Sequence, residues 1–377
     1  MSEVAKIEIP PPGSFIQEEL DARGWSQSDL AYILGVPTQS LNPIINGKRG
    51  ISTEMAKSLG DAFNVSPVLF SNLQAAYDLQ ASRDTDPGIA RRARLQDHFP
   101  VREMVKRGWL EDTKDAGELE AQMAGFFRVR EVAEVPYLDH AAKKSRYEEK
   151  EIPPAELAWL FRVHQIARTM VLPKYSSQLL RKRLDALSAL TVEPEEIRRV
   201  PAILEECGVR LIFVEKLPQA KIDGVCFWLD RKQPVIGMSL RFDRIDNFWF
   251  VIRHEIEHVL QRHGMNEEII DDLEGEKAGQ GDDLPEEERI ANAAASEFCA
   301  PSAELNFFIT RKHPYFSERD ILGFAKAHKR HPGLVIGQIH DKTKNYKLLR
   351  KHLVKVRQFI THLAPTDGWG DVFPVDA

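Results

Sequence analysis

Two histidines and a glutamate lie within one short stretch of the chain, and their types and spacing suit metal chemistry. His254, Glu255 and His258 follow the order His-Glu-x-x-His inside an amphipathic segment. Residues four apart share one face of a helix, so both imidazoles can reach the same ion. Glu255 would be the catalytic acid/base, which takes a proton from metal-bound water and passes it to a leaving amine. The spacing therefore predicts a zinc-dependent peptidase site.

A catalytic zinc ion takes three protein ligands and keeps one position open, so the chain must supply a third. Glu288 follows the second histidine by thirty residues, at the expected start of another helix, in the form Glu-x-x-Ala-Asn. Asn292 shares its helix face, which predicts a hydrogen bond from Asn292 to a ligand histidine. Glu286 and Glu287 are alternatives, and the spacing to Asn292 favours Glu288. This context favours a zinc site over a chance motif whose histidines are only packed or solvated.

Several short motifs lie between residues 151 and 365. They are Ile222-Asp223-Gly224, Pro234-Val235-Ile236, His254-Glu255-Ile256-Glu257-His258, Ala291-Asn292 and Pro301. With these motifs the region resembles the ImmA/IrrE family of metallopeptidases, although Glu257 and His263 depart from the usual family pattern. The resemblance implies a small zincin-like fold that cleaves helix-turn-helix repressors. It also implies Glu255 as catalytic acid/base and, as Zn2+ ligands, His254, His258 and Glu288.

Residues 14–80 have the boundary signals of several short helices. Ser26 and Asp29 can form a capping box, and Gly35-Val36-Pro37 makes a short turn to the next helix. The expected caps of other helices are Ser14, Ser52 and Ser66. Two helices joined by a short turn with glycine are typical of a helix-turn-helix. We expect helices at about 14–23, 26–34, 38–46, 52–64 and from 66 onward.

The same region carries a further set of short motifs. They include Pro12-Gly13, Trp25-Ser26-Gln27-Ser28-Asp29-Leu30-Ala31, Leu34-Gly35-Val36, Asn46-Gly47-Lys48-Arg49, Ile51-Ser52 and the tail Leu73–Leu79. Residues 10–80 thereby resemble the HigA-type antitoxins of the XRE-like helix-turn-helix group. The resemblance implies that a homodimer binds operator DNA with its third helix in the major groove. The expected base contacts are Thr38, Gln39, Ser40 and Asn42, and the expected phosphate contacts are Gln27, Lys48 and Arg49.

Two features of this region argue against DNA binding. Residues 1–80 carry five basic and nine acidic side chains, a balance of −4, whereas phosphate contacts draw on a basic surface. Pro43 lies inside the third helix, where it removes a backbone donor and should kink the helix. A protein-interaction module therefore stays open as an alternative. We still expect DNA binding, because the charge of one face matters more than the sum.

The bulk composition is that of a globular protein with more than one domain. The chain has 377 residues, 43% hydrophobic and 29% charged, and a net charge of −6. There is no run of about 18 apolar residues, no secretory signal and no CxxC pair, so we expect a cytoplasmic protein without membrane contact. Residues 266–288 hold eleven acidic side chains against one lysine, which predicts a solvated loop, with a lid over the site as the alternative.

Strand-like segments in the second half are flanked by helical patterns. The strands are expected at 209–215, 224–229 and 234–238, and the helices at 155–190, 246–262, 286–300 and most of 302–363. The pattern predicts a mostly helical α+β protein. The predicted domains are an all-α helix-turn-helix domain at 10–80, a helical linker or adapter at 81–150 and a zincin-like domain with a small sheet at 151–365.

These motifs together predict a transcriptional regulator or antitoxin-like protein that carries a zinc-dependent peptidase domain. Its substrate would be a repressor, a small toxin partner or the chain itself. One alternative is a non-catalytic antitoxin and operator-binding regulator whose metal site is structural or vestigial. Another is a protein-binding module that captures a toxin without touching DNA.

Overall fold

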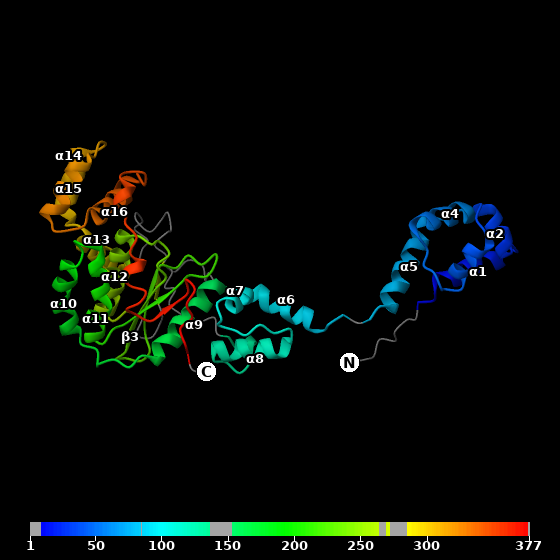
Figure 1. Ribbon diagram of the computed structural model, residues 1–377, viewed down its shortest axis with the longest axis horizontal. Helices are drawn as coiled ribbons and strands as arrows, with labels where there is room; N and C mark the ends of the chain where they lie inside the picture. Colours follow the sequence, from blue (N-terminus) through cyan, green and yellow to red (C-terminus); the bar gives the residue numbers. More distant parts are fainter. Residues whose placement is uncertain (1–8, 84, 136–152, 264–268, 272–284, 376–377) are drawn as a thin grey trace. The chain divides into compact units, whose positions relative to one another are not determined.

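The computed structural model describes residues 9–83, 85–135, 153–263, 269–271 and 285–375 (Figure 1). The chain divides into two compact units, Met1–Pro87 and Gly88–Ala377. Most of the acidic segment 266–288 lies outside the described residues. None of the helices in the described ranges is long and apolar enough to cross a membrane.

The described part of the first unit is all-helical, as predicted. Its elements are α1 (Pro12–Arg23), α2 (Gln27–Leu34), α3 (Thr38–Ile45), α4 (Thr53–Phe63) and α5 (Pro67–Ala81). The predicted capping box is present, because the Asp29 N–H donates to the Ser26 hydroxyl at 3.2 Å and the Ser26 N–H donates to the Asp29 carboxylate at 2.7 Å. Ser14 is not the cap of α1. The helix begins earlier, at Pro12, because a proline at the first helical position has no N–H that needs a partner.

Helix α3 packs tightly against α1 and is not ended by its proline. A Cβ at Gly13 would lie 2.2 Å from the carbonyl oxygen of Ile45, so only glycine permits this approach. The helix continues through Pro43, whose carbonyl accepts the backbone N–H groups of Lys48 at 2.7 Å and Arg49 at 3.0 Å. Beneath it lies one apolar core, which includes Ile16, Leu20, Leu30, Leu41, Leu59, Phe63 and Phe70.

The second unit combines helices with one sheet, which confirms the mostly helical α+β class. Before the sheet come α6 (Gly88–His98), α7 (Val101–Lys106), α8 (Ala116–Phe127), α9 (Pro154–Thr169), α10 (Ser177–Ala189) and α11 (Val200–Glu206). After its third strand come α12 (Ile245–Gln261), α13 (Glu286–Cys299), α14 (Ser302–Lys312), α15 (Glu318–Ala327) and α16 (Pro332–Thr343). Short 3-10 helices are Val132–Glu134, Pro194–Arg199, Arg350–His352 and Arg357–Phe359. The helical runs expected at 155–190 and 302–363 are therefore interrupted.

The sheet has the strand order β4-β2-β3-β1-β5. The strands are β1 (Arg210–Val214), β2 (Gly224–Trp228), β3 (Pro234–Met238), β4 (Ile269–Asp271) and β5 (Thr366–Asp367). Strand β1 is parallel to β3 and β5, whereas β2 is antiparallel to β3 and β4. The three central strands lie where the sequence predicted them. The edge strands were not predicted, because two or three residues carry no readable alternation.

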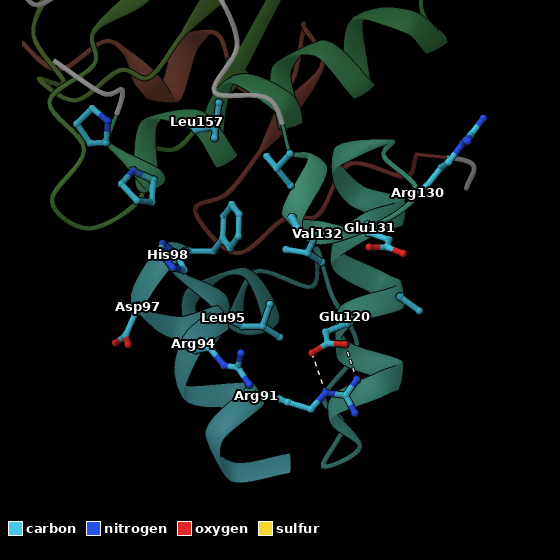
Figure 2. A pocket seen from close by; sticks show the side chains of 17 residues that line it. Arg91, Arg94, Leu95, Asp97, His98, Glu120, Arg130, Glu131, Val132 and Leu157 are labelled. Carbon is cyan, nitrogen blue, oxygen red and sulfur yellow. Dashed lines mark hydrogen bonds and ion pairs between the residues drawn. The ribbon is translucent and has the colours of Figure 1, made fainter. Parts of the chain in front are cut away.

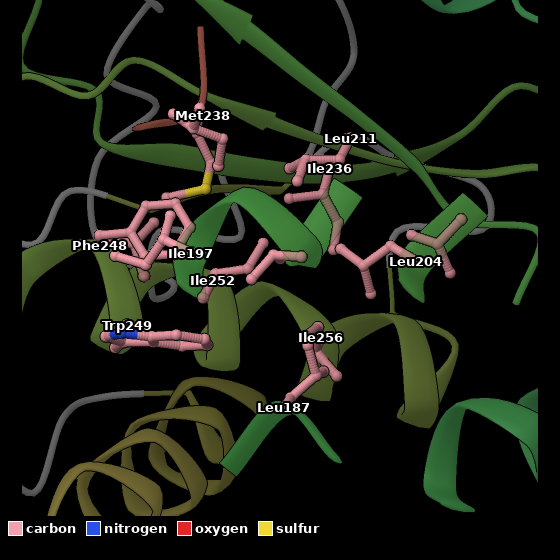
Figure 3. Close-up of a cluster of buried hydrophobic side chains, with 14 of the residues drawn as sticks. Leu187, Ile197, Leu204, Leu211, Ile236, Met238, Phe248, Trp249, Ile252 and Ile256 are labelled. Atoms are coloured by element: carbon pink, nitrogen blue, oxygen red, sulfur yellow. The ribbon is translucent and has the colours of Figure 1, made fainter. Parts of the chain in front are cut away.

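Helices cover both faces of the central strands, which are buried throughout. Alternate residues point to opposite faces. Leu211, Cys226 and Ile236 belong to a core with α10, α11 and α12, part of which Figure 3 draws. Ile212 and Val225 belong to a second core, with α9 and the helices before it. The sheet therefore forms the middle layer between α9 and α12.

The helices of the predicted adapter share the core of the second unit. The ring of Phe127 in α8 lies 4.9 Å from that of Phe161 in α9, edge to face. The amide of Gln165 donates to the carbonyl of Phe126 at 2.8 Å. Contacts thus divide the chain once, after Pro87, where the sequence suggested two boundaries. The division into three domains, at 10–80, 81–150 and 151–365, remains a prediction.

Candidate metal centre and helix-turn-helix surface

Helix α12 carries the His-Glu-x-x-His motif between two packed layers. On one side Phe248, Ile252 and Ile256 belong to the core shared with the sheet (Figure 3). At 100° per residue, His254 and His258 lie on roughly the opposite side of the helix. That side is covered by α13, which packs along α12. Both histidines are consequently fully buried.

Three predicted ligand residues converge in the structure. Nε2 of His254 lies 2.9 Å from Nε2 of His258. The Glu288 carboxylate lies 3.3 Å from the first nitrogen and 3.6 Å from the second. Among the described residues, these three form the one group of at least three histidine, cysteine or carboxylate residues whose ligand atoms all lie within 4.8 Å of one another. The structure thus brings Glu288, and not Glu286 or Glu287, to the histidines.

Glu255 lies on the sheet side of the histidines, against the first residue of β2. Its side chain is fully buried. A Cβ on Gly224 would come within 2.3 Å of Oε1 of Glu255 and 2.7 Å of Val251. The carboxylate therefore occupies space that any other residue at position 224 would fill. The sequence analysis noted Gly224 as part of a motif but gave it no role.

A buried ion pair holds the turn that leads into β2. Arg241 donates to Asp223 at 2.6 Å, and both side chains are almost fully buried. The Ser239 hydroxyl donates to the carbonyl of Ile222 at 2.6 Å, and its backbone N–H to that of Asp223 at 2.9 Å. These bonds position Gly224 beside Glu255.

The extra carboxylate of the motif, Glu257, has its own partners on α12. Arg253 donates to it at 2.8 Å and Gln261 at 2.7 Å. Burial raises the pKa of Glu257, but the hydrogen bonds from Gln261 and Arg253 outweigh burial, so the pKa is lowered. Glu257 is thus an ionised structural group.

The predicted contact from Asn292 to a ligand histidine is not present. Asn292 is half-buried on α13 and, within the described part of the chain, donates no hydrogen bond to His254 or His258. It lies one turn, about 6 Å, further along the helix than Glu288. On the other side of the His258 ring, Nδ1 of His263 lies at hydrogen-bond distance, 3.0 Å from Nδ1 of His258.

The residues predicted to contact DNA lie around α3. Thr38, Gln39 and Asn42 are exposed, as are Lys48 and Arg49 just after the helix. Ser40 and Gln27 are half-buried. The Asn42 amide oxygen accepts a bond from Asn46 at 2.8 Å, and the Gln27 amide donates to Gln17 at 3.4 Å. The helix thus presents a polar surface followed by two cations.

A cavity of about 1040 Å³ lies elsewhere, between α6, α8 and the start of α9 (Figure 2). It shares no residue with the metal cluster. Arg91 spans it and donates to Glu120 at 2.9 Å, which lowers the pKa of Glu120. Three arginines and three carboxylates line it, so its charge favours neither anions nor cations: Arg91, Arg94, Arg130, Asp97, Glu120 and Glu131.

Comparisons with known proteins match less than a third of the chain. The helix-turn-helix family model matches residues 16–70. Virulence-associated protein A' of Dichelobacter nodosus is 46% identical over 71 residues, which are 19% of this chain and 62% of that relative. The uncharacterized HTH-type transcriptional regulator YddM of Escherichia coli is 32% identical over 84 residues, 22% of this chain and 89% of that relative. The chain therefore belongs to the helix-turn-helix family.

Among solved structures, the Pseudomonas aeruginosa antitoxin HigA with higBA promoter is 31% identical, covers 21% of this chain and 98% of its own, and has a TM-score of 0.19. A HigA-family addiction module antidote protein from Coxiella burnetii is 27% identical and covers 29% of this chain and 100% of its own, with a TM-score of 0.19.

Proposed function

We propose that this protein is an antitoxin-like DNA-binding regulator that also carries a zinc-dependent peptidase centre. The peptidase part is carried by one observation, the convergence of His254, His258 and Glu288 beside the buried Glu255. The regulator part is supported by membership of the helix-turn-helix family and by the exposed polar surface of α3.

The donor set fits zinc. Two imidazoles and one carboxylate are a ligand set of catalytic zinc sites, and ligand atoms about 2.0–2.1 Å from a tetrahedral ion lie about 3.3 Å apart. The observed separations of 2.9, 3.3 and 3.6 Å are close to that spacing. His254 and His258 would bind through Nε2. When bound, zinc would polarise a peptide carbonyl and acidify water.

Glu255 is the group that would move protons. It would accept a proton from the attacking water on its carboxylate and deliver that proton to the leaving amine nitrogen, which balances the hydrolysis. Because Glu255 lies beside the ligand cluster and is not part of it, its loss should stop turnover without releasing the metal. The candidate substrates remain a repressor, a small toxin partner or the chain itself.

The peptidase proposal is tested on the purified full-length chain. Zinc content is measured by plasma mass spectrometry, and cleavage of the chain by mass spectrometry after incubation with zinc, alone and with a separate helix-turn-helix repressor. Glu288→Ala should lose zinc, Glu255→Gln should keep zinc but cleave nothing, and the matched Glu257→Gln should keep both. Zinc content unchanged in Glu288→Ala would refute the metal centre.

A non-catalytic regulator is the second candidate, since the family match covers only residues 16–70. Stoichiometric zinc with no cleavage of any of these substrates favours it. In both cases a homodimer would bind operator DNA through α3. A gel shift with the DNA upstream of its own gene, and co-purification of a small basic toxin, test these partners. Failure to bind that DNA combined with capture of the toxin favours the protein-binding module instead.

A further inference from the structure

We infer that His263 is a positioning residue for the metal ligand His258, which it orients by accepting a hydrogen bond from the second ring nitrogen. The inference rests on the proposed zinc centre. Nε2 of His258 faces His254 and Glu288, at 2.9 and 3.6 Å. Nδ1 of the same ring faces Nδ1 of His263, at 3.0 Å. The two nitrogens of His258 thus have separate partners.

The end of α12 places His263 beside that ring. Arg262 has a left-handed backbone with φ of 60°, and its N–H donates to the carbonyl of Val259 at 3.2 Å. The next N–H, of His263, donates to the carbonyl of His258 at 2.9 Å. This pair of bonds turns the chain back over the last helical turn and satisfies carbonyls that the helix leaves open.

The sheet holds the other side of His263. The indole N–H of Trp228, the last residue of β2, donates to the carbonyl of His263 at 2.9 Å. His263 is half-buried, whereas His258 is fully buried. Because its backbone is bonded on both sides, the imidazole of His263 is held against that of His258 by the fold.

The chemistry of a zinc ligand assigns the direction of the hydrogen bond. An imidazole binds metal as the neutral form, with the lone pair of one nitrogen on the metal and the proton on the other. His258 presents Nε2 to the cluster, so its proton lies on Nδ1 and is donated to Nδ1 of His263. His263 then carries its own proton on Nε2. Such a partner fixes the ring and raises its basicity, and losing it typically costs about 10- to 100-fold in metal affinity.

Two substitutions in the full-length chain distinguish the hydrogen-bond acceptor of His263 from the volume of its ring. His263→Phe keeps the ring volume but puts carbon at the Nδ1 position. His263→Asn loses the ring but places its amide oxygen the same number of bonds from the backbone, where it can accept. His362→Phe, an exposed histidine outside the cluster, is the control. Zinc affinity is measured by competition with a fluorescent chelator, and the melting temperature of the metal-free protein reports on folding.

We expect His263→Phe to weaken zinc binding about 10- to 100-fold, while His263→Asn and His362→Phe bind like the wild type. Wild-type affinity in His263→Phe, or equal losses in the Phe and Asn variants, overturns the role of His263 and leaves the metal centre standing. A wild-type chain that binds no zinc overturns both. If the Phe variant melts below the wild type, the smaller His263→Leu, which also lacks an acceptor, replaces it.

Discussion

A methyl group added at Gly224 would press directly on the proposed catalytic carboxylate. In the structure the new Cβ would lie 2.3 Å from Oε1 of Glu255, whereas ordinary van der Waals contact begins at 3.4 Å. To restore ordinary contact, the carboxylate or the strand must therefore move by about 1.1 Å, the difference between these two distances. A misplacement of about 1 Å can cost about 100-fold in rate. We expect Gly224→Ala to lower kcat by about that factor.

The same substitution should leave zinc affinity nearly unchanged, because Glu255 is not a ligand. Overpacking should also cost about 1–3 kcal/mol of stability. Gly237→Ala is the matched control, since its Cβ would meet Val163 at 2.7 Å on the opposite face of the sheet. That variant should lose comparable stability while retaining turnover.

The assays are cleavage of the substrate found for the wild type, chelator competition and urea denaturation. Wild-type turnover in a folded Gly224→Ala protein would show that the contact with Glu255 does not matter for catalysis. Equal loss of turnover in Gly237→Ala would attribute the effect to stability alone.

Three further outcomes are expected. Asp367→Ala should destabilise the second unit by about 3–5 kcal/mol in urea denaturation, because the buried guanidinium of Arg162, which donates to Asp367 at 2.6 Å, loses its charged partner and keeps the neutral acceptors of Gln165 and Phe373. A loss below about 1 kcal/mol contradicts this. Burial lowers the pKa of His164 to about 4, so the unfolded chain binds a proton at this residue at higher pH than the folded chain does. The free energy of unfolding should therefore fall as the pH drops from 6.5 towards 4. His164→Phe should make this pH dependence less steep, and an unchanged pH dependence refutes the prediction. Lys48→Ala and Arg49→Ala should each weaken DNA binding about equally for every DNA sequence and reduce the salt dependence of binding by about one phosphate contact. A variant whose gel shift equals that of the wild type excludes its residue from the DNA interface.

Much of the first unit could be predicted from interactions between residues that are close in the sequence. The capping box of Ser26 and Asp29 involves residues three apart, and the turn at Gly35 needs only a left-handed backbone that glycine adopts freely. The predicted start of α1 was wrong because two local signals compete there, a serine cap and a proline at the first helical position. Such conflicts are decided by packing, here by Gly13 against α3.

The expected contact of Asn292 failed for a different reason. Periodicity gives the face of a helix but not its height along a neighbouring helix, and only Glu288 lies level with the histidines. Helical periodicity could not predict the contact between His263 and His258, because the chain reverses direction after α12 to bring the two rings together.

Short-range periodicity and helix caps are enough to predict that His254 and His258 share a helix face and that the first unit is a helix-turn-helix. Three features followed from packing alone: which glutamate joins the histidines, the room that Gly224 leaves for Glu255, and the packing of α8 on α9. The difference lies in the range of the interactions. A helix relates residues three or four apart, whereas contacts between α12, α13 and β2 depend on how buried apolar faces fit together.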